Sequence, residues 1–81
     1  MRVSVRFYSY FQELTGCAKR IEELPEGSTI ADLLRKTLAQ FPKLEPMRNS
    51  MLLAVGVDYQ PRDYELKNGD EVSLFPPVQG G

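Results

Sequence analysis

The chain has 81 residues, a formal net charge of −1, one cysteine and neither histidine nor tryptophan. This length allows one small domain, and a near-neutral charge does not favour nucleic acid or an anionic membrane as a partner. Cys17 cannot form an intramolecular disulfide, no apolar run approaches the ~20 residues of a membrane span, and no signal peptide is evident, so we expect a cytoplasmic protein. Without histidine the chain lacks the commonest general base and metal ligand, and we expect no metal or cofactor to be bound by it.

The N-terminal segment 2–8 alternates apolar and polar residues, as a half-buried strand does. Its predicted core face carries Val3, Val5 and Phe7. Residues 9–15 lack this period, and Gly16 indicates a turn after them. We predict that the aromatic side chains in and before this stretch cap the edge of the core rather than form a ligand shelf.

Residues 19–24 are predicted to form a second, weaker strand, with Ile21 as its best core candidate. The short connection from the first strand favours an antiparallel hairpin. Cys17 lies in the intervening turn with no activating neighbour except Lys19, so we interpret it as an incidental thiol rather than a sulfur relay.

A helix is predicted to follow Pro25-Glu26-Gly27. Thr29 and Asp32 have the spacing of a capping pattern, in which the carboxylate lies at the positive end of the helix. Pro42 is expected to end the helix. The apolar residues of its predicted buried stripe are Ile30, Leu33, Leu34, Leu38 and Phe41.

The C-terminal half is predicted to complete the sheet. Residues 51–57 are apolar on both faces, as in a strand that is covered on both sides or meets a partner. Residues 71–75 are the last predicted strand, with Val72 and Leu74 on one face and Phe75 on the other. The shorter pieces are a polar loop at 43–50, a turn or short edge segment at 58–62, and a turn at Asn68-Gly69.

This order of elements predicts an α+β fold, a ubiquitin-like β-grasp with a mixed sheet of four to five strands and one main helix packed across it. The first and last strands would lie side by side at the centre of the sheet. We expect residues 1–77 to be the β-grasp domain and residues 78–81 to be a flexible C-terminal tail.

The tail ends in Gly80-Gly81. Glycine has no Cβ, so this end can enter a channel that excludes side chains. Residues 78–81 reach roughly 13 Å when extended, enough to carry a carboxylate into a neighbouring protein. We hypothesise that this carboxylate is the reactive group; the alternative is a frayed end.

Three motifs carry a specific resemblance: Gly69-Asp70-Glu71-Val72, Phe75-Pro76-Pro77-Val78 and Gly80-Gly81. Together they resemble the MoaD/ThiS ubiquitin-like sulfur-carrier family, which includes the small subunit of molybdopterin synthase and the carrier of thiazole synthesis. The two prolines favour the molybdopterin branch. Gly56 departs from the pattern, because many members have asparagine at this point.

The resemblance implies a mechanism. A ubiquitin-activating-type enzyme would use ATP and magnesium to adenylate Gly81, and a sulfur donor would convert it to a thiocarboxylate. The large synthase subunit, in a complex of two small and two large subunits, would then transfer the sulfur to cyclic pyranopterin monophosphate. By itself the chain would be a non-catalytic sulfur-donor subunit. The implied roles are sulfur carriage by Gly81, tail extension by Gly80, Gln79 and Val78, and partner binding by Phe75, Pro76 and Pro77.

Three alternatives remain open at this point. The chain could be a thiazole-type sulfur carrier, or a protein modifier joined through Gly81 to lysines of a target. It could also be an interaction domain with an inert tail.

Overall fold

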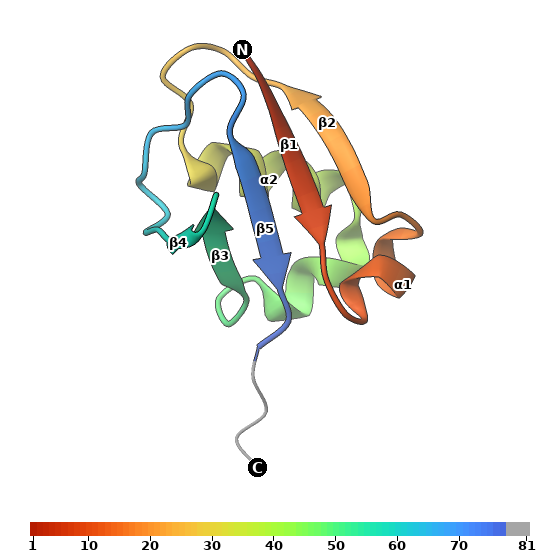
Figure 1. Cartoon of the computed structure of the whole chain (residues 1–81). Helices are drawn as coiled ribbons and strands as arrows, with labels where there is room; N and C mark the ends of the chain where they lie inside the picture. Colours follow the sequence, from red (N-terminus) through yellow and green to blue (C-terminus); the bar gives the residue numbers. More distant parts are fainter. Residues whose placement is uncertain (78–81) are drawn as a thin grey trace.

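A five-stranded mixed sheet with a helix across one face forms the described part of the chain (Figure 1). The computed structural model describes residues 1–77; the predicted tail, 78–81, lies outside the described residues. The strands are β1 (Arg2–Phe7), β2 (Lys19–Glu23), β3 (Leu52–Val55), β4 (Asp58–Tyr59) and β5 (Glu71–Phe75). The helices are α1 (Phe11–Thr15), α2 (Ile30–Gln40) and the 3₁₀ helix η1 (Pro42–Met47). The α+β prediction with one main helix is confirmed.

The first and last strands lie side by side at the centre of the sheet, as predicted. The strand order is β2-β1-β5-β3-β4, and β1 pairs with β5 in parallel from Ser4 opposite Glu71 to Phe7 opposite Leu74. The pairings β1 with β2, β3 with β5 and β3 with β4 are antiparallel. The sheet therefore joins the two ends of the chain at its middle.

The helix α2 begins at the predicted capping residues. The Thr29 hydroxyl accepts a hydrogen bond from the Asp32 backbone N–H at 3.3 Å, and the Asp32 carboxylate accepts one from the Thr29 N–H at 2.9 Å. This backbone hydrogen bond is the largest cause of the lowered pKa of Asp32. The buried residues of α2 are Ile30, Leu33, Leu34, Thr37 and Leu38.

The core lies between α2 and the facing side of the sheet. Its most completely buried side chains include Val3, Val5, Phe7, Phe11, Ile30, Leu44, Val72 and Leu74. Burial of a side chain of this size contributes about 1.5–3 kcal/mol relative to exposure. The alternation predicted for β1 and β5 thus identifies most of the sheet's contribution to the core.

Two segments for which no helix was predicted form short helices. Phe11 is fully buried in α1, where Gly16 ends the helix at φ 76°, with its N–H bonded to the Gln12 carbonyl oxygen. In the predicted polar loop at 43–50, η1 buries Leu44 completely. In each segment one apolar side chain anchors a helix too short to show a helical period.

The prediction that Ile21 is a core residue is wrong. The antiparallel register pairs Ile21 with Ser4 and Glu22 with Val3. Because Val3 faces α2, Glu22 faces α2 as well, and Ile21 lies on the opposite face with half of its surface exposed. We call this opposite face, turned away from α2, the outer face.

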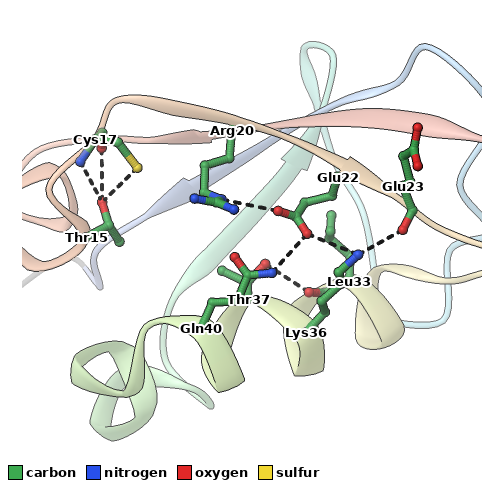
Figure 2. Close-up of polar contacts among 9 residues, drawn as sticks. All are labelled: Thr15, Cys17, Arg20, Glu22, Glu23, Leu33, Lys36, Thr37 and Gln40. Atoms are coloured by element: carbon green, nitrogen blue, oxygen red, sulfur yellow. Dashed lines mark hydrogen bonds and ion pairs between the residues drawn. The ribbon is translucent and has the colours of Figure 1, made fainter.

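Glu22 is held under α2 by three hydrogen-bonding side chains (Figure 2). Its carboxylate accepts from Arg20 Nε at 3.2 Å and Gln40 Nε2 at 3.2 Å, and it pairs with Lys36 Nζ at 3.3 Å. Only 5% of Glu22 is exposed. Burial alone would raise the pKa of this carboxyl, but the hydrogen bonds from Arg20, Lys36 and Gln40 outweigh it, and the pKa falls below its ordinary value of 4.5.

We predict that Glu22→Gln lowers the free energy of unfolding by about 1–2 kcal/mol at pH 7. The folded-state pKa of Glu22 is lower than the unfolded one, so its contribution is present above pH 4.5 and is lost as the pH falls through the folded-state pKa. Urea unfolding between pH 7 and pH 3 should therefore show a shallower loss of stability in the variant than in the parent.

The matched control is Glu23→Gln, since this neighbouring side chain is 79% exposed and lies 3.8 Å from Arg2. Its effect should stay within about 0.5 kcal/mol. Equal losses from the two substitutions would contradict a specific role for the buried carboxylate.

Candidate functional site

The end of β5, where the chain leaves the sheet, is held by an aromatic stack. The rings of Phe75 and Tyr8 lie 4.5 Å apart between centroids and are inclined by 18°. The Tyr8 N–H donates to the Leu74 carbonyl oxygen at 3.2 Å, and Leu52 of β3 is the cross-strand partner of Phe75. Both neighbouring strands thus position Phe75 on the outer face.

A shallow groove of about 340 Å³ surrounds this stack. It is lined by Tyr8, Ser9, Tyr10, Leu52, Tyr59, Phe75, Pro76 and Pro77. Tyr59 is 70% exposed and Tyr10 is 40% exposed, so their rings are open to a partner. Aromatic side chains that combine an apolar ring with a hydroxyl are frequent at protein interfaces. The groove has the composition of a protein-binding surface.

Ser9 and the two prolines shape the edges of the groove. Ser9 has a left-handed backbone, with φ 56°, at the turn from β1 into α1. Pro76 and Pro77 are half-buried, and their rings fix φ near −65° just after β5. The chain therefore leaves the centre of the sheet along a stiff segment at the end opposite the N-terminus (Figure 1).

The structure brings three of the predicted site residues together, namely Phe75, Pro76 and Pro77. The other four predicted positions, Val78, Gln79, Gly80 and Gly81, lie outside the described residues. Sequence reasoning considered the strand at 51–57 for the same patch as Phe75 without singling out Leu52, it did not assign Tyr59, and it favoured core packing for the aromatics at 8–11. That packing holds for Phe11, which is buried, but Tyr8 and Tyr10 line the groove.

The carboxyls with lowered pKa values, Glu22 and Asp32, are the buried partner of α2 and its capping residue, and neither lines the groove. Arg6 lies 6.0 Å from the Tyr8 ring centroid and supplies positive charge nearby. Cys17, which is half-buried, has its Sγ 3.7 Å from the Thr15 hydroxyl and is not part of the lining.

Two further features of residues 1–77 bear on the site. No group of three or more His, Cys, Asp or Glu side chains is arranged to hold a metal ion within this range. None of its helices has the length and apolar character of a membrane span.

Comparison with known proteins identifies the family. The model of the ThiS family matches residues 5–81. The molybdopterin synthase sulfur carrier subunit of Chlamydomonas reinhardtii is 34% identical over 83 residues, covering 100% of both chains. A Pyrococcus furiosus protein described as a molybdopterin converting factor subunit 1 is 31% identical and superposes with a TM-score of 0.87 over 96% of this chain and 99% of its own.

A second solved structure is a complex of subunits 1 and 2 of the molybdopterin-converting factor from Helicobacter pylori. The matching chain is 26% identical, with a TM-score of 0.70 and full coverage of both chains. The family model covers all but the first four residues, and the chain belongs to the ThiS family.

Proposed function

We propose that this protein is the sulfur carrier of a molybdopterin synthase and that Gly81 carries the sulfur. The observation that supports this most strongly is the family match, which runs through residue 81 and so includes Gly80-Gly81. Curated relatives matched over nearly their whole length are named molybdopterin synthase sulfur carrier subunits. The acceptor would be cyclic pyranopterin monophosphate, bound by a large subunit in a complex of two small and two large chains.

The proposed chemistry begins with activation of the carboxylate. A carboxylate is a poor electrophile, so an adenylating enzyme joins the Gly81 carboxylate to the α-phosphate of ATP with loss of pyrophosphate. A sulfide equivalent from a sulfur donor then displaces AMP and leaves a thiocarboxylate. Magnesium and ATP belong to the activating partner, and the proposed carrier contributes a nucleophilic sulfur on a side-chain-free end.

The described residues support this proposal by the way they present the tail. β5 lies between β1 and β3, with residues paired on both sides, and its last residue, Phe75, is stacked on Tyr8. A stiff Pro76-Pro77 segment then follows. Because the first residues of the exit are already ordered, they lose less conformational entropy when a partner binds.

We expect Gly81 to exchange one oxygen for sulfur when the full chain is incubated with ATP, magnesium, a sulfur source and the adenylating enzyme. Intact mass with fragment localisation is the measurement. Localisation to Gly81 is essential because oxidation of any of the three methionines adds nearly the same mass.

A chain lacking Gly80 and Gly81 is the control and should stay unmodified. A lysine-linked adduct of the parent chain would identify a protein modifier instead. An unmodified parent, under conditions that load a known carrier, would contradict any carrier function.

We also predict that Phe75→Ala weakens binding to the large subunit about tenfold or more, since a central aromatic anchor is typically worth about 2 kcal/mol or more. Titration calorimetry with the purified large subunit measures the change. Loss of the stack with Tyr8 should lower the free energy of unfolding by only about 0.5–1.5 kcal/mol, which leaves the variant folded.

Ile21→Ala is the matched control, because Ile21 is also an outer-face apolar residue but lies on β2 and does not line the groove. It should change the affinity less than about threefold, as residues outside the energetic centre of an interface do. An unchanged affinity of Phe75→Ala, or its unfolding, would exclude the anchor role.

A further inference from the structure

A second groove, of about 230 Å³, lies on the flank of α2. Three arginines from three segments line it, together with apolar residues of α2: Arg35, Arg48, Arg62, Ala31, Leu34 and Leu38. The helix α2 packs on one face of the sheet (Figure 1), and the groove around Phe75 lies on the other, the outer face. The two grooves are therefore separate. We call the second one the arginine groove.

Backbone hydrogen bonds fix the walls of the arginine groove. The Ala31 N–H donates to the Arg62 carbonyl oxygen at 2.9 Å, which attaches the segment after β4 to the first turn of α2. The Arg62 guanidinium donates through Nη2 to the Arg48 carbonyl oxygen at 2.5 Å. The positive charge of Arg62 is therefore held between the two segments rather than free to rotate into solvent.

The three guanidinium groups are available to external carboxylates. Arg35 pairs with Asp32 at 3.2 Å and Arg48 with Glu45 at 3.6 Å, and all four side chains of these pairs are at least 41% exposed. Exposed pairs of this kind contribute only about 0–1 kcal/mol, so a partner carboxylate can replace either acid. Within residues 1–77, no carboxylate oxygen lies within 4.0 Å of a guanidinium nitrogen of Arg62.

We propose that the arginine groove binds an acidic peptide segment of a partner protein, with one aliphatic side chain of that segment seated against Leu34 and Leu38. Arginine binds carboxylates through paired N–H donors, and three arginines at the rim suit a run of acidic residues. The volume is below the ~300 Å³ at which small-molecule sites begin, which favours a side chain over a cofactor. A net charge of −1 and an apolar floor disfavour nucleic acid.

This inference goes beyond sulfur carriage and does not depend on it. A partner bound on the α2 flank leaves the groove around Phe75, Pro76 and Pro77 uncovered. The chain could thus be held by one protein through α2 while a second protein engages its C-terminal end.

The test uses the full ¹⁵N-labelled chain and a synthetic peptide, acetyl-Asp-Glu-Leu-Glu-Glu-amide, at near-physiological salt. Binding should shift the amide resonances of residues 31–38, 48–49 and 62. The double variant Arg35→Gln/Arg62→Gln should raise the Kd about tenfold or more, because two charge-assisted contacts are lost. Glutamine keeps an amide donor at position 62, so the variant should retain a native dispersed spectrum.

The matched control is Lys43→Gln/Lys67→Gln, which removes the same charge from two exposed residues outside the groove. It should change the Kd less than about threefold. A peptide with serine in place of leucine should bind at least about threefold more weakly, since the aliphatic contact is lost.

Four results with the peptides would overturn the proposal. These are no shifts at millimolar peptide, shifts centred on the Phe75 groove, equal weakening by the two double variants, and equal binding of the serine peptide. Tighter binding of an oligothymidylate of equal charge would identify a nucleic-acid surface instead and would also overturn it.

Discussion

The parallel pairing of β1 with β5 is the constraint on which the rest of the structure depends. It joins residues from the two ends of the chain, from Ser4 opposite Glu71 to Phe7 opposite Leu74. Parallel strands end at the same edge of a sheet, so Tyr8, which follows β1, meets Phe75, which ends β5. An antiparallel pair would have placed the two rings at opposite edges, and the groove around the exit would not form.

The polar contacts of Glu22 attach the edge strand β2 to α2. They matter because β2 contributes little apolar surface to the core. In β2 only Glu22 is buried, and it contacts α2 through Lys36 and Gln40. Lys36 also donates to the Glu23 carbonyl oxygen at 2.9 Å. Because the carboxylate is buried beside its partners, a shift of β2 by one residue would expose Glu22 and bury Ile21 without restoring these contacts. The contacts of Glu22 thus favour a single register.

The sequence predicts the long elements of this structure better than the short ones, because a long element repeats its apolar pattern. β1, α2 and β5 show their periods over five or more residues, and the Thr29–Asp32 capping pattern locates the start of α2. By contrast, α1 has five residues, which is little more than one helical turn, and β4 has two. Neither element is long enough for its period to repeat. Phe75 was assigned to the site from the tail motif, and the doubly apolar strand at 51–57 was considered for the same patch. The particular residues Leu52 and Tyr59 are placed there by the registers of β3 with β5 and β4. Such pairings are set by tertiary structure and are invisible to local patterns.

The two grooves lie on opposite sides of the sheet, and this separation matters for a protein that would act through its end. Among the described residues, the two carboxyls with lowered pKa values, Glu22 and Asp32, do not line the groove at the exit. In the proposed function, an activating enzyme and a sulfur-accepting subunit would both bind at the exit and would therefore compete for it. A contact on α2 escapes this competition, because α2 lies on the opposite face of the sheet from Phe75. On this proposal, the α2 flank would be the surface through which the chain stays attached while its end changes partners.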